Sequence, residues 1–321
     1  MKAVIFQKYG SPDVMKLREV QKPVPGDDEV LVKINATCVN AGDWHLLRGK
    51  PFPVRLFFGF TKPKFQILGA DIAGTVEAVG ASVREFGSGD EVFANVSECG
   101  FGGFAEYVAV PENTLVAKPA GMTFEEAAAV PQAAVTALQG LRDFGKIQAG
   151  QSVLINGASG GVGTFAVQIA RSFGAEVTGV CSSRNVEMVR SIGADHVIDY
   201  TKEDFTKGEL RYDLILDAAA FRSMFDYRRA LNPGGIYVLV GGDRFFETIL
   251  LGPLVSLLGK RKMVNMLHKP TREDLIVLKE LVEAGKVKPV IDRQYTLSEV
   301  PEAVRYQEEG HTQGKVVITM N

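Results

Sequence analysis

The chain has 321 residues, enough for two domains, and its composition of 46% hydrophobic and 23% charged residues is ordinary for a globular protein. The formal net charge of -2 provides no basic field, so we expect no nucleic-acid partner. Cys38, Cys99 and Cys181 are scattered without a Cys-x-x-Cys pair, and the first residues carry no secretory pattern, so we expect a cytoplasmic protein without disulfides.

The first third of the chain consists of short apolar runs separated by Gly, Pro, Asp and Ser. We expect strands at residues 1–6, 29–37, 71–79, 91–96 and 104–110. This pattern is typical of a twisted, barrel-like β domain. Asp43 is expected to cap a short helix at 44–48, and residues 50–64, rich in Pro and Phe, are expected to form a loop.

The pattern changes at Thr123, which forms a capping box with Glu126 and opens an Ala-rich helix that Pro131 interrupts. Strands and helices then alternate: strands at 152–155, 176–180, 197–198, 214–216 and 235–240, and helices at 161–173, 185–192 and 221–231. This alternation predicts an α/β fold with a parallel, doubly wound sheet. A helix at 272–284, a strand at 292–295, a helix at 300–309 and a strand at 315–319 follow.

The most apolar stretch, residues 245–258, contains Glu247, Gly252 and Pro253. It is too short and too interrupted to span a bilayer, so we expect no membrane span. We expect a buried or subunit-facing helix here, and contact with a membrane surface is the alternative.

A glycine-rich turn in residues 152–163, SVLINGASGGVG, joins a predicted strand to a predicted helix. Gly160 and Gly163 match the second and third glycines of the G-x-G-x-x-G fingerprint, and Ala158 stands at the first position. Glycine lets the backbone approach a pyrophosphate, and a helix N-terminus offers N–H groups and positive potential. The residues expected at the phosphates are Ser159, Gly160, Gly161, Val162 and Gly163. An ordinary strand–helix turn is the alternative.

The residues after the second strand of this unit indicate which nucleotide binds. NAD-specific folds carry an acidic residue at the end of that strand, whereas this chain has Cys181 followed by Ser182, Ser183 and Arg184. Hydroxyl and guanidinium groups suit a 2′-phosphate, and the absence of Asp or Glu in this stretch removes repulsion against it. The sequence therefore predicts NADPH as the cofactor, with a solvated turn and an incidental arginine as the alternative.

Several segments in a fixed order carry a family resemblance: VNAGDWHLLRG (39–49), LGADIAGTVEAVG (68–80), GGFAEYVAV (102–110), INGASGGVGTFAVQIA (155–170), YDLILDA (212–218) and GKVVI (314–318). With them the chain resembles the zinc-independent quinone oxidoreductases, the zeta-crystallin-like branch of the medium-chain dehydrogenase/reductase superfamily. It also resembles the alkenal and enone reductases of that branch.

The resemblance implies a domain organisation and an assembly. A GroES-like catalytic domain would span residues 1–124, a Rossmann NADP-binding domain 125–265, and a C-terminal segment, 266–321, would return to the catalytic domain. The active site would lie in the cleft between the domains. A homodimer would form through residues 235–240 as the edge strand of the sheet.

The ligands of metal-dependent relatives are missing from this chain. Carried over residue by residue, their catalytic Cys, His and Cys fall on Asn40, Ala70 and Gln132, and a nearby Glu falls on Asp71. Zinc requires thiolate or imidazole ligands, and a neutral amide is a poor substitute. Of the four structural cysteines, the corresponding loop has only Cys99. We therefore expect no zinc of either kind.

The resemblance also assigns further cofactor contacts. Tyr200 would lie at the adenosine side and Thr136 at the nicotinamide ring, while Gly241 and Gly242 would border the nicotinamide. Lys315, in the segment GKVVI, is placed among the cofactor-binding residues as well.

Three residues near the lost metal position are catalytic candidates. Asn40 would orient cofactor or substrate because it replaces a metal ligand, or it satisfies loop backbone groups instead. His45 matches a proton-relay histidine of metal-dependent relatives, although a simple surface hydrogen bond is the alternative. Asp43 is expected to cap a helix or support the site rather than act as a base.

Without a metal to polarise a carbonyl, conjugated acceptors suit the site, because the negative charge left by a hydride spreads onto a distant oxygen. We predict an NADPH-dependent oxidoreductase that reduces quinones or α,β-unsaturated carbonyls, with a small apolar substrate. A reductase of simple aldehydes or ketones, and a low-turnover NADPH-binding structural or interaction protein, are the alternatives. A group of aromatic residues would line an apolar pocket or pack the loop: Trp44, Phe52, Phe57, Phe58 and Phe60.

Overall fold

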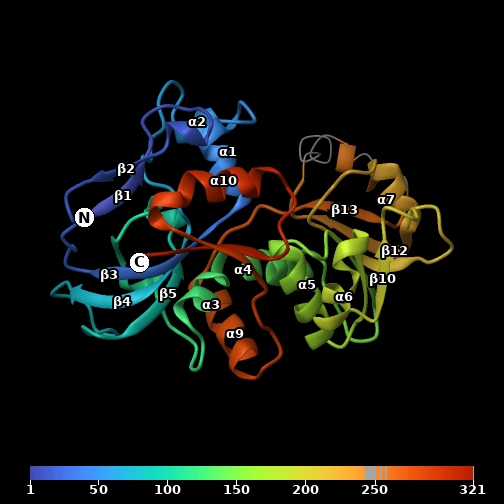
Figure 1. Ribbon diagram of the computed structural model, residues 1–321. Coiled ribbons are helices and arrows are strands. Elements are labelled where there is room, and N and C mark those ends of the chain that lie inside the picture. The colour runs from blue at the N-terminus through green and yellow to red at the C-terminus, as the bar shows by residue number, and fades with distance from the viewer. Residues whose placement is uncertain (243–250, 254, 257–258, 321) are drawn as a thin grey trace. The chain divides into compact units, whose positions relative to one another are not determined.

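The computed structural model describes residues 1–242, 251–253, 255–256 and 259–320 (Figure 1). The chain forms two compact units. Unit 1 comprises Met1–Gln132, Pro270–Glu283 and Ile291–Asn321, and unit 2 comprises Ala133–Lys269 and Ala284–Val290. The predicted stretch 245–258 falls largely outside the described residues. In the part of the chain that is described, no helix combines the length and hydrophobicity that crossing a membrane requires.

Unit 1 is built on a sheet that has seven strands among the described residues, in the order β14-β15-β3-β4-β5-β7, with β6 paired to β3. Its strands are β3 (Glu29–Val39), β4 (Asp71–Val79), β5 (Glu91–Asn95), β6 (Tyr107–Pro111), β7 (Val116–Ala117), β14 (Ile291–Thr296) and β15 (Lys315–Thr319). Strands β1 (Lys2–Ile5) and β2 (Lys16–Glu19) form a separate antiparallel pair. Strand β15 is antiparallel to β3, so the chain ends in unit 1.

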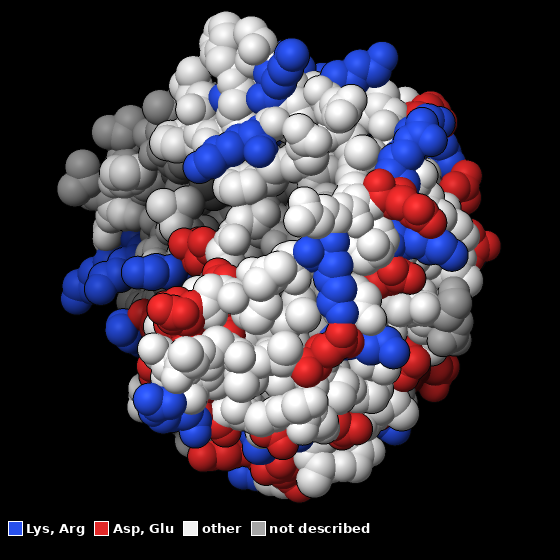
Figure 2. All heavy atoms as spheres, turned by 90° about the vertical axis from the view of Figure 1, so that its left-hand side faces the viewer, with Lys and Arg blue, Asp and Glu red and all other residues white. Residues whose placement is uncertain are grey.

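The helices of unit 1 are α1 (Ala41–Arg48), α2 (Val54–Phe58), α3 (Phe124–Ala128), α9 (Arg272–Glu283) and α10 (Val300–Glu308). The predicted capping box is confirmed, because Glu126 N–H donates to the Thr123 hydroxyl and the Glu126 carboxylate accepts from Thr123 N–H. Helix α2 lies inside the predicted 50–64 loop. On the face in Figure 2, acidic and basic side chains mix over the lower part, whereas the top shows Lys and Arg among uncharged residues.

Unit 2 contains a six-stranded parallel sheet among the described residues, in the order β10-β9-β8-β11-β12-β13. Its strands are β8 (Ser152–Asn156), β9 (Glu176–Cys181), β10 (His196–Asp199), β11 (Tyr212–Asp217), β12 (Leu231–Leu239) and β13 (Lys262–Asn265). Its helices include α5 (Gly161–Ser172), α6 (Val186–Ser191) and α7 (Met224–Ala230), while α4 (Pro131–Gln139) starts at the boundary with unit 1. The predicted α/β fold with a doubly wound sheet is confirmed.

The order of strands locates the binding edge of unit 2. From β8 the chain proceeds to β9 and β10 on one side, and it then returns to β11 on the other side of β8. Such a reversal opens a crevice at the carboxyl ends of the two central strands, where ligands bind in open α/β sheets. Here these ends are Asn156 and Asp217.

One prediction about the sheet is wrong. Residues 235–240 were expected to form an edge strand, but β12 pairs with β11 on one side and with β13 on the other. Strand β13 has only four residues, KMVN, and so short a stretch shows no clear strand pattern in the sequence. Strand β13 therefore ends the sheet order instead.

Candidate functional site

The glycine turn of unit 2 has the geometry of a phosphate-binding corner. Strand β8 leads into the turn, and Gly160 caps the twelve-residue helix α5. A Cβ added to Gly163 would lie 2.0 Å from the Gly157 carbonyl oxygen, so only glycine allows this close contact. A Cβ added to Gly160 would meet nothing closer than 3.5 Å, which leaves open space at the helix N-terminus. These residues fit a pyrophosphate.

The turn after β9 is tied directly to the glycine turn. Ser183 and Arg184 are exposed, while Asn185 is buried beneath them. The Asn185 amide nitrogen donates to the Ser159 hydroxyl at 2.9 Å and to the Ser182 hydroxyl at 3.3 Å. Asn185 thereby joins the two segments predicted to bind cofactor. Its place just before α6 indicated only an ordinary helix start in the sequence.

The stretch after β9 has no Asp or Glu of its own, but the neighbouring strand brings an acidic residue to it. Asp199, the last residue of β10, pairs in register with Cys181 at the end of β9. Its carboxylate accepts hydrogen bonds from the Ser183 hydroxyl at 2.5 Å and the Thr201 hydroxyl at 2.6 Å, and Lys202 Nζ lies 3.2 Å away. These donors hold the pKa of Asp199 well below its usual range.

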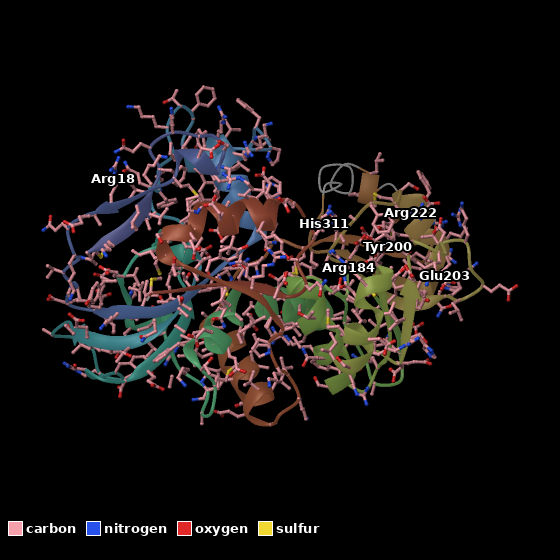
Figure 3. The ribbon with its side chains drawn as sticks, in the orientation of Figure 1. Arg18, Arg184, Tyr200, Glu203, Arg222 and His311 are labelled. Atoms are coloured by element: carbon pink, nitrogen blue, oxygen red, sulfur yellow. The ribbon has the colours of Figure 1, made fainter. Side chains whose placement is uncertain are left out.

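Aromatic and cationic side chains gather at the same edge of unit 2. Tyr200 and Phe221 are 46% and 44% exposed, with ring centroids 5.8 Å apart. The Arg222 guanidinium lies 5.2 Å from the Phe221 ring. Figure 3 shows Arg184, Tyr200 and Arg222 in one region of this unit. Together they offer flat and positive surfaces suited to the adenosine part of a nucleotide.

A buried polar network in the interior of unit 2 holds the residues of this edge in place. Asp217 is 0% exposed and accepts from the Asn156 amide at 2.7 Å and from the Tyr237 hydroxyl at 2.8 Å. Burial raises the pKa of Asp217. The buried Tyr227 hydroxyl accepts the backbone N–H groups of Phe221 and Arg222, each at 3.3 Å. This network therefore fixes the loop that presents the two side chains, and sequence reasoning missed it.

Two glycines predicted to border the nicotinamide adjoin this network. Gly241 N–H donates to the Asp217 carbonyl at 3.3 Å, and Gly242 has a φ of 109°. A Cβ on Gly242 would lie 2.4 Å from Ala220 N, so glycine is required there. The predicted nicotinamide contact Thr136 has its hydroxyl 3.1 Å from Nδ1 of His268, a residue that sequence reasoning had not placed at the site. These contacts place Thr136 and His268 together within unit 2.

In unit 1, three side chains distant in sequence meet in the interior. Lys315 is 3% exposed and Asp71 is 0% exposed. The Lys315 ammonium donates to Oδ1 of Asn40 at 2.5 Å and lies 3.5 Å from Oδ2 of Asp71. The Asn40 amide nitrogen donates to the same Oδ2 at 2.9 Å. Both ends of the Asn40 amide are thus bound within unit 1, and the cofactor contacts of Asn40 and Lys315 stay predictions.

The Asp71 carboxylate has further partners at its second oxygen. Oδ1 accepts from Gln132 N–H at 2.8 Å and from the Asn95 amide at 3.2 Å, and the same Asn95 amide donates to the Gln132 side chain at 2.7 Å. Burial raises the pKa of Asp71, and the Lys315 charge opposes that rise. The predicted positions Asn40, Asp71 and Gln132 are therefore brought together, and Lys315 supplies their positive charge.

Asp43 and His45 occupy different surroundings on α1. The helix was predicted to start at Trp44 behind an Asp43 cap, but it starts at Ala41 and Asn40 is its N-cap. The buried Asp43 carboxylate accepts from Asn40 N–H at 2.7 Å, as the third helical residue of a capping box does, and from Gly69 N–H at 3.0 Å, a contact outside the helix. Burial raises its pKa to about 7. His45 stacks on Trp44 and has Nδ1 3.1 Å from the Lys50 carbonyl oxygen. Since a carbonyl only accepts, Nδ1 carries the proton in this arrangement.

The residues at the metal position do not fit zinc. Ala70 has no donor atom, Gln132 offers an amide, and Oδ1 of Asn40 already accepts from an ammonium group. A divalent cation beside Lys315 would be repelled. Among the described residues, no group of three or more His, Cys, Asp or Glu side chains is arranged to hold a metal ion.

Comparisons with known proteins cover nearly the whole chain. The model of the alcohol dehydrogenase GroES-like domain matches residues 26–120, and that of the zinc-binding dehydrogenase matches residues 192–318. A chloroplast envelope quinone oxidoreductase homolog of Arabidopsis thaliana is 34% identical over 331 residues, covering 99% of this chain and 98% of the relative.

A chloroplastic NADPH-dependent alkenal/one oxidoreductase of the same plant is 36% identical over 330 residues, covering 99% of this chain and 79% of the relative. Among solved structures, the quinone oxidoreductase of Coxiella burnetii has a TM-score of 0.89 at 29% identity. That alignment covers 100% of this chain and 99% of the other.

Proposed function

The chain belongs to the quinone oxidoreductase and alkenal reductase branch of the medium-chain dehydrogenase/reductase superfamily, and from that premise we propose that it reduces quinones or α,β-unsaturated carbonyls with NADPH, without zinc. When bound, NADPH supplies the hydride. The glycine turn and the N-terminus of α5 would hold its pyrophosphate, and the loops after β9, β10 and β11 would hold its adenosine part.

The observation that carries the zinc-independent assignment is the buried contact of Lys315 with Asn40 and Asp71. An ammonium group takes up the polar atoms that a metal would need, so these residues supply no Lewis acid. Conjugated acceptors can react without a Lewis acid, because the negative charge that hydride addition leaves is delocalised onto an oxygen remote from the attacked carbon. This reasoning favours enones and quinones over simple carbonyls.

NADPH rather than NADH is the finer part of the proposal. Ser182 and Arg184 supply donors of the kind that a 2′-phosphate accepts, and Lys202 adds a cation beside Asp199. Asp199 opposes the phosphate by its charge, and its bonds from Ser183, Thr201 and Lys202 offset that charge locally. The name of one relative specifies NADPH dependence, which supports the same choice.

The test is a parallel steady-state assay of NADPH oxidation with a quinone, an alkenal, an enone and a saturated aldehyde. We expect turnover with the first three. No turnover with any acceptor would overturn the proposal, and turnover with the saturated aldehyde alone would assign a simple carbonyl reductase instead. Gly160→Val provides the background, because its side chain enters the open space at the helix N-terminus without a backbone clash. Stoichiometric zinc in the purified protein would contradict the metal assignment.

A homodimer is part of the proposal, with β13 rather than β12 as the contact strand. Strand β13 ends the described sheet order, and a terminal strand offers backbone groups to a second copy, although Met263 N–H on this edge already donates to the Ser256 hydroxyl at 3.0 Å. Sedimentation velocity tests the assembly: we expect a dimer, and a monomer at every protein concentration would overturn this part of the proposal. A cytoplasmic location also stays a proposal, which fractionation of cells would test.

A further inference from the structure

The segment between Asp43 and Asp71 has an unusual charge pattern. It contains five basic residues and no acidic one: Arg48, Lys50, Arg55, Lys62 and Lys64. Arg48 forms a salt bridge with Glu308 at 2.8 Å, so part of this charge serves unit 1 itself. Lys50, Lys62 and Lys64 are exposed. Three exposed ammonium groups therefore stand on a segment that offers them no acidic partner of its own.

Part of the segment is fixed to unit 1 by inward contacts. The rings of Phe58, Phe65 and Phe101 form a mutual cluster with centroid distances of 5.4 to 6.3 Å. The Tyr9 hydroxyl donates to the Phe58 carbonyl at 3.1 Å, and the Arg55 guanidinium lies over the Tyr9 ring. These contacts account for the folding of the segment, and they confirm that some of its aromatic residues pack the loop.

Other apolar side chains of the same segment point outward. Phe52, Leu56, Phe57 and Phe60 are 58%, 62%, 78% and 61% exposed. Phe52 and Phe60 contact each other edge to face at 5.8 Å, which leaves most of both rings open. Single exposed apolar residues are normal on proteins, but several large ones on one short segment indicate an interaction site.

We propose that residues 50–64, the docking loop, bind the surface of a bilayer that contains anionic lipid. Aromatic rings prefer the boundary between headgroups and acyl chains, and lysines beside them attract anionic headgroups. The docking loop presents both kinds of side chain together, because it carries the exposed rings Phe52, Phe57 and Phe60 and the exposed lysines Lys50, Lys62 and Lys64. A bilayer supplies apolar depth and negative charge at one flat surface.

Two other occupants fit the charge pattern less well. A second copy meeting through the same patch would bring two basic patches together without acidic partners, since a two-fold contact uses the same surface on both subunits. An acidic protein would satisfy the lysines, but acidic side chains are poor partners for the exposed Phe52, Phe57 and Phe60. The bilayer is therefore the occupant for which we argue, and this inference does not depend on the reductase activity.

The test is co-sedimentation of the full chain with vesicles of phosphatidylcholine, with and without phosphatidylserine. We expect binding only to the vesicles with phosphatidylserine, and we expect it to weaken as salt is added. Lys62→Gln/Lys64→Gln should lower the partition coefficient about fivefold for each lysine. Phe57→Ser should lower it about tenfold while leaving the charge unchanged.

The matched control is Lys286→Gln/Lys288→Gln, which removes two exposed lysines outside the docking loop and changes the net charge equally. We expect this variant to bind like the wild type. If both double lysine variants lost vesicle binding equally, net charge alone would explain the effect. If Phe57→Ser bound vesicles as well as the wild type, no apolar contact would be involved. Either result overturns the proposal. The proposal would also be overturned if sedimentation velocity showed that the chain self-associates and that Phe57→Ser abolishes this self-association. Circular dichroism of each variant confirms that it is folded.

Discussion

Replacement of Lys315 by Met tests the reasoning on the buried network of unit 1. The substitution keeps a long side chain but removes the charge that faces Asp71, which is 0% exposed. Loss of one partner of a buried ion pair costs about 3–5 kcal/mol, because the remaining charge stays desolvated. Asp71 keeps donors from Asn40, Asn95 and Gln132, so we expect the lower end, about 3 kcal/mol.

The assay is equilibrium unfolding in urea, followed by fluorescence. Trp44 is the single tryptophan of the chain and belongs to unit 1, so its emission reports the unit that is perturbed. Lys315→Met/Asp71→Asn removes both charges and is expected to regain most of the loss, whereas exposed Lys286→Met should stay within about 0.5 kcal/mol of the wild type. A loss below about 1 kcal/mol for Lys315→Met, or a double variant as unstable as the single one, would refute the reasoning.

Three further predictions follow from the two units. Burial raises the folded-state pKa of Asp43 to about 7, so the stability that this group contributes is present below its unfolded pKa near 4 and is lost as the pH rises through 7. The unfolding free energy of the wild type, relative to that of Asp43→Asn, should therefore fall by about a few kcal/mol between pH 4 and pH 7. Parallel pH curves for the two proteins would contradict this. Arg184→Ala should raise the KM for NADPH roughly tenfold while leaving that for NADH nearly unchanged, and an equal rise in both would count against a 2′-phosphate contact. Tyr227→Phe leaves the N–H groups of Phe221 and Arg222 without their acceptor, so urea titrations should show that the unfolding free energy falls by about 1–3 kcal/mol. The KM for NADPH and the KM for NADH should rise together, and unchanged stability would contradict the network.

The parts of the molecule that depend on local sequence could be predicted. Thr123 and Glu126 lie three residues apart, and the glycine turn between β8 and α5 is continuous in sequence, so their patterns were visible. The lack of thiolate and imidazole groups at the metal position could also be recognised from the sequence, because residue identity alone decides which donor atoms are present.

The contacts that give the site its charges could not be predicted in the same way. Lys315 and Asn40 are 275 positions apart, and only the pairing of β15 with β3 brings them together. Asp199 reaches Ser183 because β10 runs beside β9, a proximity that their separation of 16 positions conceals. Sheet pairing decides both contacts, and the resemblance had placed Lys315 at the cofactor.

The position of β15 also affects the order in which unit 1 can be completed. During synthesis β3 and β4 leave the ribosome early, while β15 follows every other described strand of unit 1 and connects β14 to β3. Its first residue is Lys315, so the step that closes the sheet also delivers the cation to Asp71. Before β15 docks, Asp71 lacks this cation, so burying its charge at that stage would carry a larger desolvation cost than in the finished unit.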